Sequence, residues 1–110
     1  FLLQLLGSLP AAIRSTVTTG EVVALLVKPA TARRRCRFVE LPAMRDLVGA
    51  PRAFVSHVWS GLFTDLVAAI AHAIPEDECV WCDIFSVRQW PGNVADLDFG
   101  CAIHAAPVFL

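Results

Sequence analysis

The sequence carries little charge and no marked excess of either sign. Charged residues make up 17% of its 110 residues and hydrophobic residues 56%, and the formal net charge is −1. A chain this apolar is unlike intrinsically disordered segments, which lack the apolar surface that a core needs. A net charge near zero also gives no global attraction to nucleic acid or to an anionic membrane. We therefore expect a packed domain with no nucleic acid and no membrane among its partners.

Long apolar runs are missing as well. No uninterrupted run approaches the roughly 20 residues that a bilayer-spanning helix needs. Residues 1–6 resemble the core of a signal peptide, but they have no basic leader, and Gly7, Pro10 and Arg14 follow soon after. The segment is more typical of an internal helix. Because the sequence begins without Met and ends on the apolar residues 107–110, we expect a piece of a longer cytoplasmic protein.

The four cysteines do not form the paired pattern of a zinc site. Cys79 and Cys82 have the C-x-x-C spacing of redox motifs and of half a zinc site, whereas Cys36 and Cys101 stand alone. Cys82 also falls inside a predicted strand, where residues three apart point to opposite faces. We expect buried free thiols in a reducing compartment and no bound metal. A thiol or metal site at Cys79 and Cys82 is the alternative.

Two β-prone segments with an amphipathic helix between them form the centre of the sequence. The first strand is predicted at residues 53–56 and the second at residues 79–87, and residues 62–74 between them carry a wide apolar face at helical spacing. This order predicts a β-α-β unit with a right-handed crossover and parallel strands. A third strand is predicted at residues 105–110. We therefore expect one small α/β domain with a three-strand parallel core.

The first 50 residues predict a helical lead-in packed on this core, and residues 51–110 form the α/β unit itself. Thr18 and Glu21 match a capping box, which predicts a helix from Gly20 to Lys28 that Pro29 ends. The basic residues 33–37 follow without Gly or aromatic residues among them. They predict a solvated loop, with a phosphate contact as the alternative.

Polar side chains follow the first predicted strand, where α/β units place their ligands. Ser56 is suited to donate a hydrogen bond to a ligand phosphate or ribose hydroxyl, and His57 is either a proton carrier or a cap of the strand–helix turn. Trp59 either stacks on a planar ligand or covers the edge of the sheet. Neighbouring strand residues point to opposite faces, so Ser56 and His57 are not a catalytic dyad.

Asp83 is a carboxylate inside the second predicted strand. Burying it without a partner would be costly, so we expect it to pair with Arg52 or Arg88, with a backbone amide, or with a ligand hydroxyl. No P-loop and no G-x-G-x-x-G motif is present, so the usual nucleotide fingerprints are absent.

The loop after the second strand carries Arg88, Trp90, Pro91 and Gly92. An exposed Trp beside Pro-Gly favours recognition of another molecule. The alternative is an ordinary turn with the Trp side chain folded back onto the domain. Both interpretations remain open from the sequence.

These motifs together resemble TIR-like (Toll/interleukin-1 receptor-like) domains of a divergent protist or algal type. The likeness lies in Arg52-Ala-Phe-Val-Ser-His-Val-Trp59, the helix 62–74, Val80-Trp-Cys-Asp-Ile-Phe85 and Trp90-Pro-Gly92. It covers residues 52–110, about half the chain. The resemblance implies a flavodoxin-like parallel sheet in an intracellular signalling or defence protein. It further implies that Ser56, His57 and Trp59 line a nucleotide pocket, and that the loop with Pro91 and Gly92 mediates contacts.

Two activities are associated with such domains. One is cleavage of NAD at the nicotinamide glycosidic bond, with NAD as a substrate rather than a tightly bound cofactor. The other is non-catalytic interaction through homotypic self-association. The catalytic Glu of the family lies on a helix after the third strand, beyond Leu110, and the family's Arg-Asp pair is Arg88-Gln89 here. We therefore assign no catalytic residue and expect residues 1–110 alone to be inactive on NAD.

Overall fold

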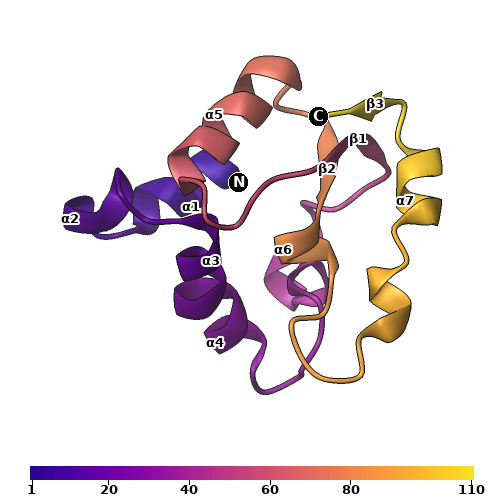
Figure 1. Cartoon of the computed structure of the whole chain (residues 1–110), viewed down its shortest axis with the longest axis horizontal. Coiled ribbons are helices and arrows are strands. Elements are labelled where there is room, and N and C mark those ends of the chain that lie inside the picture. The colour runs from indigo at the N-terminus through magenta and orange to yellow at the C-terminus, as the bar shows by residue number, and fades with distance from the viewer.

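A three-stranded, all-parallel sheet lies at the centre of the protein. The computed structural model describes all 110 residues and places β1 (Pro51–Val55) between β2 (Cys79–Cys82) and β3 (Val108–Phe109), as Figure 1 shows. Both neighbours run parallel to β1. The strand order β2-β1-β3 is the order with which a flavodoxin-like sheet begins. The predicted α/β class and parallel core are confirmed.

Helix α5 (Phe63–Ala73) connects β1 to β2, within one residue of the predicted bounds at each end. Its buried residues Phe63, Leu66, Val67 and Ile70 recur at helical spacing, so one face packs into the core. No side chain caps the N-terminus. Instead, the Phe63 amide donates to the Val17 carbonyl at 3.0 Å, because residues 17 and 18 pair with the segment before the helix.

The N-terminal half is helical, as predicted. It contains α1 (Leu2–Ser8), α2 (Ala11–Arg14), α3 (Thr19–Val22) and α4 (Lys28–Thr31), with a π-helical turn at Val23–Val27. The capping box of Thr18 and Glu21 is present with both of its hydrogen bonds. The prediction that Pro29 ends this helix was wrong, since the helix continues to Thr31. The wider π turn, in which the Lys28 amide bonds to the Val23 carbonyl, accommodates a residue without an N–H.

One hydrophobic core joins the two halves of the chain. Fifteen buried residues form a single cluster that includes Val17, Val22 and Val27 from the lead-in and Ala53 and Val55 from β1. Residues 1–50 therefore pack on the sheet and have no separate core. None of the helices has the length and apolar character that crossing a bilayer requires.

The second strand is shorter than predicted. It ends at Cys82, and residues 83–86 form the helical turn α6 (Asp83–Ser86). This turn buries Ile84 and Phe85, and the Phe85 ring lies 5.6 Å from the Phe1 ring and 5.3 Å from the Phe38 ring, centre to centre. The aromatic contacts hold the chain in a helical conformation that the sequence pattern alone does not indicate.

The chain then crosses to the opposite side of the sheet from α5. A 3₁₀ turn (Val94–Leu97) and α7 (Gly100–Ala105) precede β3, and Figure 1 shows α5 and α7 on opposite sides of the strands. Further 3₁₀ turns lie at Phe38–Glu40 and Pro42–Met44, before β1. The sheet is thus covered by the large core on one face and by the α7 segment on the other.

Candidate functional site

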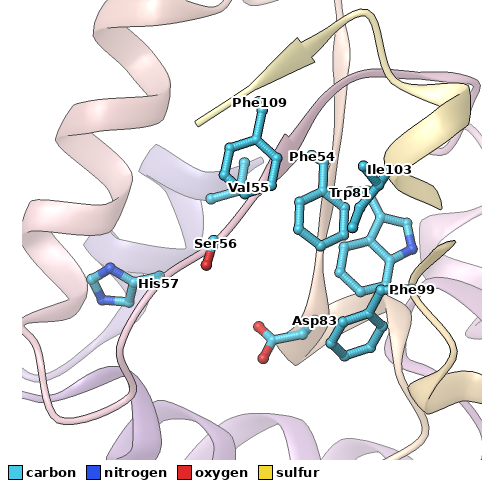
Figure 2. Close-up of a pocket in the computed structure, with 9 residues that line it drawn as sticks. All are labelled: Phe54, Val55, Ser56, His57, Trp81, Asp83, Phe99, Ile103 and Phe109. Carbon is cyan, nitrogen blue, oxygen red and sulfur yellow. The ribbon is translucent and has the colours of Figure 1, made fainter.

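A pocket of about 180 Å³ lies where the carboxyl ends of β1 and β3 meet. In a doubly wound sheet this is the point at which the connections from neighbouring strands leave in opposite directions, and ligands bind there. Figure 2 shows its lining residues, which come from β1 and the two residues after it, from β2, from the first residue of α6 and from the 99–109 segment: Phe54, Val55, Ser56, His57, Trp81, Asp83, Phe99, Ile103 and Phe109.

Aromatic rings form one wall of the pocket. Phe54 in β1 stands in register with Trp81 in β2 and Phe109 in β3. Its ring stacks on both, with centroid distances of 4.7 and 5.3 Å and interplanar angles of 10° and 16°. Phe99 adds an edge-on contact to Trp81 at 5.0 Å. The Phe109 side is open, because this residue is 63% exposed.

The sequence interpretation missed this aromatic wall, although a signal for it was present. Phe54 lies two residues before Ser56, and Trp81 lies two residues before Asp83. Residues two apart in an extended chain share one face. The same pattern that places Ser56 and Asp83 at the strand ends therefore places an aromatic ring beside each of them.

Ser56 and Asp83 form the polar end of the pocket. In Figure 2 Ser56 lies to the left of the Phe54 ring and Asp83 lies below it, and both residues line the pocket. Trp59 Nε1 donates a hydrogen bond of 2.9 Å to Asp83 Oδ2. Ser56 is exposed, and its hydroxyl has no hydrogen-bond partner within the protein, although its backbone amide donates to the Leu110 carbonyl. A hydroxyl and part of a carboxylate are therefore free for a ligand.

Neither of the arginines expected beside Asp83 pairs with it, and the Arg88 guanidinium makes no ion pair at all, with its Nε buried without a hydrogen-bond partner. Arg52 pairs with Glu78, with 3.3 Å between Nε and Oε2, and the Arg88 amide donates to Asp96 Oδ2 at 3.0 Å. The expectation of an arginine partner was wrong because Asp83 is not inside a buried strand. It begins α6 and is only half-buried. An indole N–H and the helix N-terminus are sufficient partners for a carboxylate in that place.

The ring of His57 lies apart from these polar groups. Figure 2 shows the imidazole pointing away from the aromatic wall and from Asp83. Its Nε2 is buried without a hydrogen-bond partner, and it packs against Gly61, where an added Cβ would lie 3.2 Å from Nε2. His57 thus touches the pocket but occupies the β1–α5 turn.

The loop after the second strand does not reach the pocket, since none of Arg88, Trp90, Pro91 and Gly92 lines it. Trp90 is folded back on the domain, where its Nε1 donates to the Thr31 hydroxyl at 3.0 Å. Lys28 Nζ lies 5.0 Å and Arg35 Cζ 5.4 Å from the centre of the indole ring. Of the two interpretations of this loop, the folded-back Trp is the one observed. Pro91 and Gly92 remain exposed.

A second polar cluster centred on Asp96 was not anticipated. Its carboxylate bonds to the Arg37 guanidinium and to the Arg88 amide, and only 4% of its side chain is exposed. The Arg37 hydrogen bond lowers the pKa of Asp96 to about 2. No sequence signal joins residues 59 positions apart. This cluster anchors the 88–97 segment to the lead-in.

The four cysteines are free. Only Cys82 is buried, and burial raises the pKa of its thiol to about 12. Cys36 and Cys79 are half-buried and Cys101 is exposed, so the expectation that all four are buried was wrong. No group of three or more His, Cys, Asp or Glu side chains has the arrangement of a metal site.

Comparisons with known proteins give no relative for this chain. No protein-family model, curated protein or solved structure matches it.

Proposed function

We propose that residues 1–110 are part of a TIR-like intracellular signalling or defence protein, and that their pocket binds the nicotinamide–ribose end of NAD⁺. The observation that carries this proposal is the meeting of an aromatic wall with a free hydroxyl and a carboxylate at the β1/β3 switch point. This place is the usual ligand position of the fold.

The oxidised nicotinamide ring suits both the aromatic wall and the polar end of the pocket. It is planar and positively charged, so it can stack on an aromatic face with a cation–π contribution. Asp83 supplies a negative charge at the same opening, and no Lys or Arg lines the pocket to oppose the ring. The preference should therefore be for NAD⁺ over the neutral ring of NADH.

The size of the pocket limits which part of the dinucleotide it holds. About 180 Å³ is below the roughly 300–1,000 Å³ of sites that enclose a drug-sized ligand. One ring and part of its ribose fit, with ribose hydroxyls within reach of Ser56 and Asp83, while the rest of the dinucleotide lies outside. Binding is then weak, which agrees with a substrate rather than a resident cofactor.

We do not expect residues 1–110 alone to cleave NAD⁺. The resemblance assigns catalysis to a Glu on a helix after the third strand, and all four glutamates here, Glu21, Glu40, Glu76 and Glu78, precede β3. Stabilising the oxocarbenium-like transition state needs a carboxylate placed at the scissile bond. We propose that the 1–110 chain binds and orients NAD⁺ without hydrolysing it.

A chemical-shift titration of NAD⁺ into ¹⁵N-labelled protein tests this function. The amides of Ser56, Asp83 and Phe109 should shift, and Ser56→Ala should weaken binding about two- to tenfold through loss of one hydrogen bond. Ser60→Ala is the matched control, since Ser60 does not line the pocket. Shifts confined to other surfaces, or equal weakening by both variants, would contradict the proposal. Release of nicotinamide by the wild-type protein that is lost in Asp83→Asn would also contradict the proposal, because it would show hydrolysis at this pocket.

The second candidate is a non-catalytic module that self-associates. It is favoured by apolar side chains exposed on the C-terminal segment, where Val94 is 79%, Leu97 53% and Phe109 63% exposed. Sedimentation velocity across a concentration series tests it. A dimer that Leu97→Asp dissociates supports this function, and a monomer at all concentrations rules it out.

A further inference from the structure

The outer edge of β2, which is the edge of the sheet farthest from β3, lies in a large groove. All four residues of β2 line this groove, whose volume is about 1280 Å³. The groove is bounded by α1, by the 46–52 segment, by α5 and by the turn before β2. Its volume exceeds the roughly 300–1,000 Å³ of small-molecule sites, so its dimensions suit a longer occupant.

The backbone of β2 has hydrogen-bonding groups to offer along this edge. Outside the sheet, no backbone hydrogen bond involves Cys79, Val80 or Trp81. Alternate residues of a strand direct their N–H and C=O groups to opposite sides, so those that do not face β1 point into the groove. An unpaired edge of this kind is a template for one further strand.

The groove offers apolar contacts next to this edge. Leu47 is 50% and Val48 46% exposed, and both belong to the segment beside β2. The Leu47 carbonyl accepts a weak contact from Cys79 Sγ at 3.8 Å, which places this segment against the first residue of the strand. A strand added to β2 could set alternate side chains against these residues.

The charges around the groove determine the chemistry of the partner. Its two guanidinium groups are engaged, Arg37 with Asp96 and Arg52 with Glu78. Asp46, Glu76 and Asp77 also line it, are exposed, and take part in no ion pair or hydrogen bond through their side chains. The uncompensated charge is therefore negative. We propose that this groove binds an extended, basic peptide segment of another protein, which adds as a strand to β2.

Fluorescence anisotropy with a labelled alternating Arg–Val hexapeptide tests this proposal. The peptide should bind, and N-methylation of alternate backbone nitrogens should abolish binding, because strand addition needs those N–H groups. An alternating Glu–Val hexapeptide should not bind. Amide hydrogen exchange should slow in residues 79–82 when the Arg–Val peptide is present.

Charge reversal provides the matched protein variants. Glu76→Lys with Asp77→Lys should weaken binding about three- to tenfold, whereas Asp65→Lys, an exposed acid outside the groove, should not. Val48→Ser should also weaken binding, because it removes an apolar contact at an exposed position and leaves the charge of the groove unchanged. The proposal is overturned by no binding, by equal binding of the Glu–Val peptide, or by protection outside β2. It is likewise overturned if sedimentation shows that a second copy of this chain fills the groove.

Discussion

Trp59 Nε1 lies 2.9 Å from Asp83 Oδ2 and connects the β1–α5 loop to the first residue of α6. The two residues are 24 positions apart, and each follows a strand at the carboxyl edge of the sheet. The hydrogen bond orients the carboxylate at the opening of the pocket. The hydroxyl of Ser56 has no partner within the protein and faces the same pocket.

Trp59→Phe should destabilise the fold by about 0.5–1.5 kcal/mol, since it removes one hydrogen bond to a carboxylate that remains partly solvated. Urea denaturation at pH 7 measures the change. Trp90→Phe is a comparison variant, because it removes the bond to the Thr31 hydroxyl, which is buried. Equal stability of wild type and Trp59→Phe would show that the Trp59–Asp83 bond contributes nothing to the fold.

Asp96→Asn should destabilise the protein at neutral pH and have less effect in acid. The folded pKa of Asp96, about 2, is below its unfolded value, so the Asp96 carboxylate stabilises the fold above pH 4. That contribution is lost as pH falls from about 4 to about 2. We expect Asp96→Asn to lower the free energy of unfolding by about 1 kcal/mol at pH 7. The value is small because the Arg37 side chain is 41% exposed and solvent screens the pair.

Urea denaturation of wild type and Asp96→Asn at pH 7, 4 and 2 measures this effect. The difference in unfolding free energy between the two proteins should shrink between pH 4 and pH 2. A difference that is constant from pH 7 to pH 2 would contradict the assignment of the stabilising charge to Asp96.

Gly61→Ala should destabilise the β1–α5 turn by about 1–2 kcal/mol. The added Cβ would lie 3.1 Å from the Val58 carbonyl oxygen and 3.2 Å from the His57 ring, which forces a shift in a packed turn. Gly7→Ala is the control: it lies in α1 with no atom within 4 Å of the added Cβ and should be neutral or stabilising. Thermal unfolding of both variants distinguishes the outcomes.

Thiol reactivity should separate the cysteines by burial. Cys101 is exposed and should react with a thiol reagent in the folded state, whereas Cys82 should react only on unfolding, because burial raises its pKa to about 12. Mass spectrometry after timed alkylation at pH 8 measures the order. Early labelling of Cys82 would contradict its buried position.

The β-α-β unit could be predicted because its signals are local. Strand and helix periods differ, and α5 shows its apolar face at the spacing of Phe63, Leu66, Val67 and Ile70. The capping box was equally local, because the Thr18 hydroxyl accepts a hydrogen bond from the Glu21 amide and the Glu21 carboxylate accepts one from the Thr18 amide.

The errors arose where distant residues decide the local structure. Residues 83–86 have an apolar pair that fits either a strand or a helix, and packing of Phe85 against Phe1 and Phe38 selects the helix. The helix continues past Pro29 because of the π turn at Val23–Val27, and no simple residue pattern predicts such a turn.

The candidate site was predicted in part for the same reason. The strand ends indicated that Ser56 and Asp83 lie at the same edge of the sheet, because parallel strands end at the same edge, and both residues line one pocket. Their binding of a ligand stays a prediction. The partner of Asp83 and the folded-back position of Trp90 depend on tertiary contacts across 24 and 59 positions. Sequence spacing carries no information about such contacts.

Comparing the affinities of NAD⁺ and NADH in wild type and in Asp83→Asn tests the proposed pocket most directly. Isothermal titration calorimetry should show that the wild type prefers NAD⁺ about two- to fivefold, as a cation–π contact of about 0.5–1 kcal/mol implies. Loss of the carboxylate should reduce that preference and leave the stacking contribution. Equal affinity of the wild type for both forms, or a preference for NADH, would contradict the account.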